Sequence, residues 1–276
     1  METPPGLVAA EPLIRLAAFA GVLLLCAAGE ALAPWRRPRL PRRARWPGNL
    51  GLVALDGLLL RVLFPTAAIG AALVAEAQGT GLLRRLGAPG WLAVPAAVVL
   101  LDLAIYLQHR VFHAVPALWR LHRVHHADPE LDATTGLRFH PIEILLSMAI
   151  KIAVVSALGA PAVAVLLFEV LLNAGALFSH ANLALPGRLD AALRLVLVTP
   201  GMHRVHHSVV PAETDCNFGF CLSWWDRLFC TYRAAPAAGE ERMTVGLAVF
   251  RDPAELRLDR LLTQPFRGGT VPPRRG

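Results

Sequence analysis

Long apolar segments constrain the fold of this 276-residue chain more than any other feature. A helix needs about 20 mostly apolar residues to cross the hydrocarbon core of a bilayer. The segments that approach or exceed this length are residues 13–33, 50–75, 91–107 and 144–178. The last is long enough for two spans, with a turn at Gly159-Ala160-Pro161. We therefore expect an all-α polytopic membrane protein with five transmembrane helices, or four if the last pair forms a shallow hairpin.

The overall composition agrees with this expectation. Hydrophobic residues make up 55% of the chain and charged residues only 17%, and the mean hydropathy is +0.50. The net charge of +7 comes from arginines that cluster between the spans, where anionic lipid headgroups and control of topology explain them. Nothing in the sequence resembles a nucleic-acid-binding module, so we expect no nucleic-acid partner.

The arginines also predict the orientation of the chain. The loop between the first two spans carries Arg36, Arg37, Arg39, Arg42, Arg43 and Arg45. The loop between the next two spans carries only Arg84 and Arg85. The positive-inside rule then places the first loop in the cytoplasm and the N-terminus outside. We expect an integral protein of the bacterial inner membrane with its histidine-rich segments on the cytoplasmic face.

Ten histidines are confined to residues 109–207, a concentration for which packing offers no explanation. Eight of them form three groups, which are His109/His113, His122/His125/His126 and His203/His206/His207. Residues three or four apart share a helical face, so each group can hold a metal ion from one side. Neutral imidazole suits iron, zinc, copper and nickel, and this many ligands exceed what one ion uses. The pattern predicts a site for two metal ions.

The two isolated histidines are less specific. Taken singly, His140 and His180 are as consistent with hydrogen-bonded core residues as with ligands. Together with the three groups, both join the expected ligand set, with His140 either a tenth ligand or a hydrogen-bond donor behind the ligands.

Four other side chains are candidates to accept hydrogen bonds from ligating imidazoles, since such rings usually donate their second N–H. Asp102 lies seven residues before His109 on the same helical face, and a bond between helices is an equally good interpretation of it. The other candidates are Asn182, Asp215 and Asn217, of which the asparagines could equally cap helices.

With these residues in view, the chain resembles the fatty acid hydroxylase superfamily, also called the sterol desaturase family. The resemblance covers about residues 95–233 and is closest to bacterial members. It rests on the three histidine groups and on Arg138-Phe139-His140-Pro141, Ser179-His180-Ala181-Asn182, Thr214-Asp215-Cys216-Asn217-Phe218-Gly219-Phe220 and Trp225-Asp226-Arg227-Leu228-Phe229. Cys230 departs from the pattern, since related sequences usually carry glycine there.

The resemblance implies a membrane-embedded oxidoreductase with two iron ions and O2 as co-substrate. It would hydroxylate, or less readily desaturate, a C–H bond of a lipid such as a fatty acyl or sterol-like substrate, and no catalytic residue is expected beyond the metal ligands. A separate ferredoxin, cytochrome or reductase would donate electrons. The expected divisions are membrane-anchor helices in residues 1–90, a catalytic domain in 91–233 and a Pro/Arg-rich tail of weak structure in 234–276.

Two other classes of protein also use histidine-rich membrane segments. A metal transporter or sensor would place its ligands near the bilayer midplane on broken helices, whereas these histidines follow the spans. A zinc-dependent lipid hydrolase would need an open metal position and a base, and the chain has no HExxH motif. We therefore expect the lipid-oxidising enzyme and not these two alternatives. The sequence does not indicate its oligomeric state.

Overall fold

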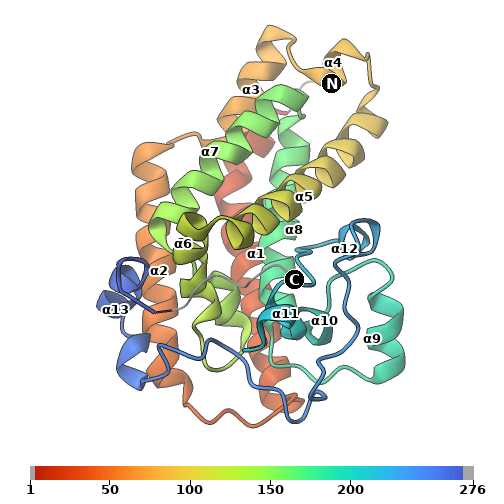
Figure 1. The fold of residues 1–276 in the computed structure, drawn as a ribbon. Coiled ribbons are helices and arrows are strands. Elements are labelled where there is room, and N and C mark those ends of the chain that lie inside the picture. The colour runs from red at the N-terminus through yellow and green to blue at the C-terminus, as the bar shows by residue number, and fades with distance from the viewer. Residues whose placement is uncertain (1–3, 270–276) are drawn as a thin grey trace.

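The computed structural model describes residues 4–269, and within this range the chain is all-helical (Figure 1). Extended pairing in the described part is limited to isolated two-residue bridges. The helices are α1 (Pro5–Leu32), α2 (Arg42–Leu63), α3 (Ala67–Gln78), α4 (Leu82–Arg85), α5 (Gly90–Ala114), α6 (Pro116–His126), η1 (Ala133–Leu137), α7 (Pro141–Leu158), α8 (Ala162–His180), α9 (Gly187–Leu193), α10 (Pro200–His206), α11 (Pro211–Thr214), α12 (Trp224–Leu228), η2 (Pro253–Leu256), α13 (Leu258–Thr263) and η3 (Gln264–Phe266). The predicted all-α fold class is confirmed.

Five segments of the described chain are long and apolar enough to cross a bilayer. They are Ala9–Leu32, Arg42–Arg85, Gly90–Ala114, Pro141–Leu158 and Ala162–His180. Helix α1 begins at the end of the bundle formed by α3 and α4, and α10 lies toward the opposite end (Figure 1). The composition and length of these helices fit an integral membrane protein.

The last two candidate spans are complete helices of 18 and 19 residues, each long enough by itself to cross a bilayer. The chain turns between them at Gly159, whose φ of 61° lies in the left-handed region that favours glycine. A Cβ at this position would lie 2.3 Å from the carbonyl oxygen of Thr80. The turn therefore requires glycine both for its backbone conformation and for close packing.

The second predicted span differs from the continuous helix that residues 50–75 suggested. Its helix breaks between α2 and α3, where Phe64 has φ of −133° and ψ of 66°. Phe64 precedes Pro65, and a residue before proline is disfavoured in the helical region. The helix resumes at Ala67, so the second crossing consists of two helical pieces.

Helix α8 lies at the centre of the bundle and packs against α1, α3, α5 and α10 (Figure 1). An apolar core between α3, α5, α7 and α8 includes Ala72, Leu101, Val155 and Phe168. Burying these side chains fixes the position of α8. The last residue of α8, His180, is thereby placed beside α10.

The helices after α8 are short. Residues 189–198 form an apolar run that is only partly helical, because α9 ends at Leu193. The following residues are instead extended, because Leu197 bridges Leu222 and the Val198 N–H donates to the Cys221 carbonyl at 2.9 Å. Residues 208–220 form a loop that contains the single turn of α11, and α12 covers only Trp224–Leu228.

The C-terminal segment was expected to have weak structure, but its described part folds against the bundle. Leu256 and Leu261 are buried, and Leu261 packs in a cluster with Leu52 of α2 and Val124 of α6. The segment is rich in proline and arginine, and this composition suggested weak structure although the leucines are spaced for burial. Residues 253–266 therefore form part of the support of α6.

Gly48 makes the closest backbone approach to this segment, and its replacement by alanine is expected to loosen it. A Cβ at Gly48 would lie 2.1 Å from the Leu256 carbonyl oxygen, so α13 and its neighbours must shift, at a cost of about 1–3 kcal/mol. Gly57 of the same helix has open space around it, so Gly57→Ala should be neutral or stabilising by up to about 1 kcal/mol. Hydrogen exchange of residues 253–266 measures the effect, and equal protection in both variants would contradict this packing.

Candidate metal centre

Two helices joined at a proline carry the first five grouped histidines. His109 and His113 lie four residues apart on the last turns of α5. The chain then reverses at Val115, which is extended, before Pro116 begins α6. This reversal faces α6 toward α5, so the ring centroids of His109 and His122 lie 4.8 Å apart.

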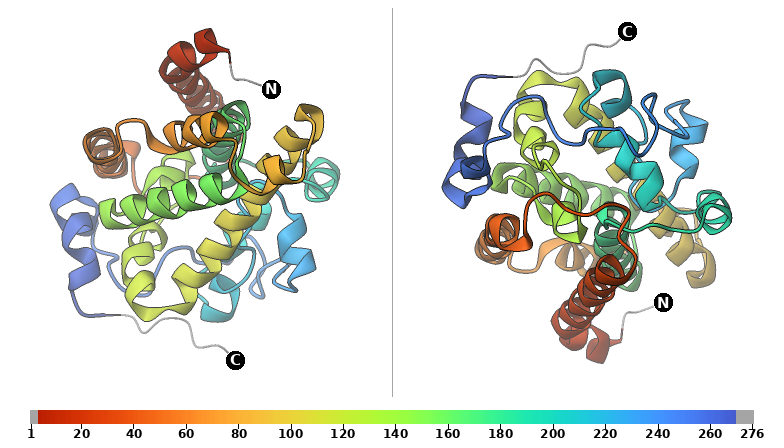
Figure 2. Two further views of the ribbon diagram at one scale, coloured as in Figure 1. Left: turned by 90° about the horizontal axis from the view of Figure 1, so that it is seen from above. Right: turned by 90° about the horizontal axis from the view of Figure 1, so that it is seen from below.

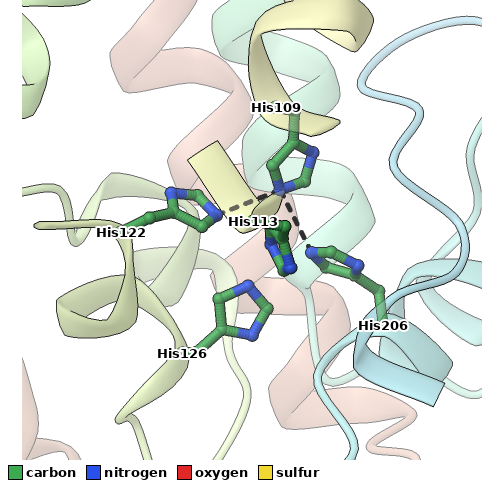
Figure 3. A group of neighbouring side chains, drawn as sticks. All are labelled: His109, His113, His122, His126 and His206. Atoms are coloured by element: carbon green, nitrogen blue, oxygen red, sulfur yellow. Dashed lines mark hydrogen bonds between the residues drawn. The ribbon is translucent and has the colours of Figure 1, made fainter. Parts of the chain in front are cut away.

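A five-histidine group forms where α5, α6 and α10 meet. Each member offers a nitrogen within 4.8 Å of the others, and all five are buried. The members are His109, His113, His122, His126 and His206. In Figure 3 the rings of these residues surround a common centre.

A four-histidine group lies directly beside it and consists of His125, His180, His203 and His207. Consecutive residues of α6, His125 and His126, enter different groups, and so do His206 and His207 at the end of α10. The rings of His126 and His207 stack with their centroids 4.6 Å apart. The two groups are therefore held at a fixed separation by the same two helices.

Backbone carbonyls orient the ring nitrogens of the five-histidine group. Nδ1 of His109 donates to the Phe218 carbonyl at 2.8 Å, and Nδ1 of His206 donates to the Cys216 carbonyl at 2.7 Å. A neutral imidazole carries one N–H, so Nε2 of each ring presents a lone pair. These Nε2 atoms lie 3.1 Å apart, where two lone pairs repel each other unless a cation lies between them. The arrangement fits metal ligation.

The four-histidine group converges on His180 in a similar way. Nδ1 of His180 donates to the Ala176 carbonyl at 2.7 Å, which leaves a lone pair on Nε2. The Nε2 atoms of His125, His203 and His207 lie 3.0, 3.0 and 3.1 Å from it. One lone pair accepts only one of these contacts as a good hydrogen bond. A bound cation would satisfy all four rings.

Burial keeps the histidines that lie outside the spans neutral. It lowers the pKa of His122 to about 3. Burial and repulsion between neighbouring rings hold the pKa well below its ordinary value for His125, His126, His203, His206 and His207. These imidazoles carry no charge at neutral pH, so their lone pairs are available to a metal.

Two carboxylates accept hydrogen bonds from histidines of the five-histidine group. Oε1 of Glu143 lies 2.6 Å from Nδ1 of His122, and Oδ1 of Asp215 lies 3.3 Å from Nδ1 of His113. Asp215 was among the sequence candidates, whereas Glu143 was not. The signal for Glu143 was available, because it is the acidic residue at the start of a largely apolar helix, three positions after His140.

Asp102 takes the second of the two roles that the sequence left open, a bond to another helix. It accepts hydrogen bonds from the backbone N–H groups of Cys221 and Leu222, at 3.2 and 3.1 Å, and from the Trp225 indole at 2.8 Å. These partners belong to the segment that follows the third histidine group. Asp102 therefore anchors this segment to α5, and among the described residues the structure records no bond from it to a histidine.

The two candidate asparagines also bind backbone. The amide of Asn182 donates to the Arg36 carbonyl at 2.8 Å and accepts from the Arg36 N–H at 3.2 Å. Asn217, with a φ of 52°, donates to the carbonyls of Met202 and Arg233 at 2.8 Å each. Asn217 thus clamps α10 to the chain after α12, and Asn182 clamps the loop after α1.

His140 lies outside both groups. Its Nδ1 accepts the Ile142 N–H at 3.2 Å as the N-cap of α7, and its Nε2 donates to the Leu262 carbonyl at 3.2 Å. Both ring nitrogens therefore have backbone partners. The structure brings nine of the ten histidines together and assigns the tenth to joining α7 with the C-terminal segment.

Replacing Glu143 with leucine is expected to weaken metal binding by about 10–100-fold, the usual cost of losing a carboxylate behind a ligating histidine. Glu143→Gln keeps an acceptor oxygen near His122 and should lose less. Competition with a chelator, followed by elemental mass spectrometry of the protein, measures both affinities. Unchanged affinity in Glu143→Leu would show that the bond to His122 does not support a ligand.

Comparison with known proteins shows which family this chain resembles. Residues 94–231, half of the chain, match the protein family described as fatty acid hydroxylase. The chain is 34% identical over 144 residues to a protein named ornithine lipid hydroxylase OlsE, from Rhizobium tropici. This alignment covers 52% of the chain and 42% of the relative, so the chain spans less than half of the relative's length. No solved structure matches the chain.

Proposed function

This chain belongs to the fatty acid hydroxylase family, and from that membership we propose that it is an integral membrane hydroxylase of lipids that uses two iron ions and O2. The observation that carries the proposal is the pair of adjacent histidine groups with ring nitrogens converging at 3.0–3.1 Å. Nitrogen-rich donor sets of this kind suit iron. When bound and reduced, an iron pair supplies the means to activate O2 and break an unactivated C–H bond.

The nine histidines would hold the two ions, five on one side and four on the other. Their burial excludes water from the site, which protects a reactive centre from side reactions. The Phe218 and Cys216 carbonyls keep the protons of His109 and His206 on Nδ1, so that Nε2 faces inward. Glu143 does the same for His122.

A lipid would reach the site from the bilayer. Helix α5 exposes Leu107 and Val111 on one face and carries His109 and His113, both buried, on the other. The histidines thus lie one helix thickness from apolar surroundings. The name of the relative, which specifies a lipid, supports a membrane lipid over a soluble metabolite.

The arginines of the loop between α1 and α2 lie near the end of the molecule that carries α10 (Figure 1). The positive-inside rule therefore supports a cytoplasmic location for the histidine groups, in the inner membrane of a bacterium. Electrons would come from a separate protein.

The proposed activity is tested by labelling. Iron-loaded protein in lipid nanodiscs would be reduced with dithionite, exposed to ¹⁸O2, and its lipids analysed by mass spectrometry. The expected result is a lipid that carries one ¹⁸O atom in a new hydroxyl group. A new double bond without label would indicate desaturation, and lipid hydrolysis by zinc-loaded protein without O2 would contradict the proposal.

A further inference from the structure

A cavity of about 390 Å³ is lined by arginines from two distant parts of the chain. Its charged lining residues are Arg36, Arg39, Glu130, Glu241, Arg242 and Arg251. The four guanidinium groups outnumber the two carboxylates, so the cavity has an excess of positive charge. Neither histidine group contributes to this lining.

The positive charge of the cavity is only partly neutralised within the chain. Glu130 lies 3.7 Å from Arg36 and accepts the backbone N–H of Arg39 at 3.0 Å. Among the described residues the structure records no carboxylate within ion-pair distance of the guanidinium groups of Arg39, Arg242 and Arg251. Arg251 donates instead to the carbonyls of its own segment. Burial, followed by repulsion from Arg39 and Arg251, lowers the pKa of Arg36 despite the attraction of Glu130. Such a cluster favours an anionic partner.

One wall of the cavity is hydrogen-bonded to the third histidine group. Residues Met243, Thr244 and Val245 line the cavity. The carbonyl of Thr244 accepts the Val209 N–H at 2.8 Å. Gly246, the residue that follows this wall, donates its N–H to the carbonyl of His207 at 2.9 Å. Backbone hydrogen bonds thus join the cavity wall to the chain at His207, a member of the four-histidine group.

The cavity lies on the end of the molecule, away from the lipid-facing sides. Figure 2 (right) shows that the chain between α1 and α2 and the chain after α12 cross the end opposite α3 and α4. These are the segments that supply the arginines. Exposed apolar residues of α1, such as Leu16 and Leu24, lie along the length of that helix instead. This position favours a soluble partner over a lipid headgroup.

We propose that the arginine-lined cavity is the docking surface for an acidic electron-transfer protein. The proposal rests on the proposed function, because hydroxylation needs an external reductant. The overall reaction converts R–H, O2, two electrons and two protons into R–OH and water. The docked donor is oxidised twice by one electron, O2 is reduced, and one oxygen atom enters the C–H bond while the other leaves as water.

The test uses iron-loaded protein in nanodiscs of neutral phosphatidylcholine, with a reduced acidic [2Fe–2S] ferredoxin as the probe and dithionite as the control reductant. The double variant Arg242→Glu/Arg251→Glu should slow reduction by ferredoxin about tenfold or more at low salt, as expected for lost electrostatic steering. Its reduction by dithionite should be unchanged. Arg188→Glu is the matched control, because Arg188 is also exposed but lies on α9.

Binding of fluorescently labelled ferredoxin to metal-free protein gives a readout that does not depend on activity. The double variant should weaken this binding, and added salt should weaken binding to the unmodified protein. The proposal is overturned if the double variant behaves like Arg188→Glu, if dithionite but not ferredoxin reduces the unmodified protein, or if only binding to anionic vesicles changes. Dithionite-reduced protein that fails to react with O2 would instead contradict the proposed function.

Discussion

Replacing His206 with alanine is expected to lower the metal content from two ions to about one or fewer per chain and to abolish lipid hydroxylation, because an open ligand position weakens binding and disturbs the geometry. The Nε2 atom of His206 lies 3.1 Å from that of His109, at the centre of the five-histidine group. Its neighbour His207 belongs to the four-histidine group. A shift at the end of α10 therefore affects both histidine groups.

His140→Ala is the control for this variant. His140 is also a buried histidine, but its ring caps α7 and donates to the Leu262 carbonyl. It should keep both ions, while losing an N-cap costs about 1 kcal/mol of stability. Elemental mass spectrometry of both purified variants checks the prediction. Full metal content and activity in His206→Ala would remove this residue from the ligand set.

Replacing Arg45 with methionine is expected to destabilise the protein by about 3–5 kcal/mol, since it removes one partner from a buried ion-pair network. The guanidinium of Arg45 lies 2.8 Å from Asp128 and 2.6 Å from Asp132, and all three side chains are buried. Burial opposes ionisation of Asp128, but the charges of Arg45 and Arg138 outweigh it and lower the pKa of Asp128 to about 2. Without Arg45, two charged carboxylates would lack their closest partner.

The network also positions the site, because Asp128 follows His126 by two residues. Arg45→Met should therefore lower metal content as well as stability. Unfolding in detergent micelles, followed by tryptophan fluorescence, measures the loss. Arg43→Met is the matched control, since Arg43 is exposed on the same turn of α2. A loss of less than about 1 kcal/mol in Arg45→Met would contradict this role, because surface substitutions often cost that little.

The sequence predicted the spans well because their signal is local. Apolar length and arginine-rich connections are properties of neighbouring residues. The break before Ala67 was visible as Pro65 but was outweighed by the apolar run around it. The prediction of weak structure for the C-terminal segment was wrong. Leu256 and Leu261 are buried by contacts with residues of α2, some 200 residues away in the sequence, and such contacts are not visible in the local pattern.

The histidine pattern predicted that the groups converge but not how they divide. His125 and His126 are adjacent in sequence but belong to different groups. Which group each one joins depends on the orientation of α6 about its own axis in the folded chain. The partners of Asp102 lie more than a hundred residues away, so its role in holding the segment at Trp225 required the tertiary structure. Spacing within one helix is local, whereas these contacts are not.

The partners of charged residues within the spans also could not be predicted from the sequence. Lys151 and Glu169 are charged side chains within apolar helices, where such charges are costly and often functional. In the structure, Nζ of Lys151 lies 2.9 Å from Glu169, and Arg15 of α1 lies 3.0 Å from the same carboxylate. These ion pairs join α1, α7 and α8, so the residues are explained by packing between helices.

The most direct test of the account is the metal content of the detergent-purified protein expressed with iron, determined by elemental mass spectrometry alongside reduction and O2 exposure followed by absorption spectroscopy. Two histidine groups predict about two irons per chain that react with O2 after reduction. A single inert ion, or zinc with no response to O2, would contradict the di-iron hydroxylase.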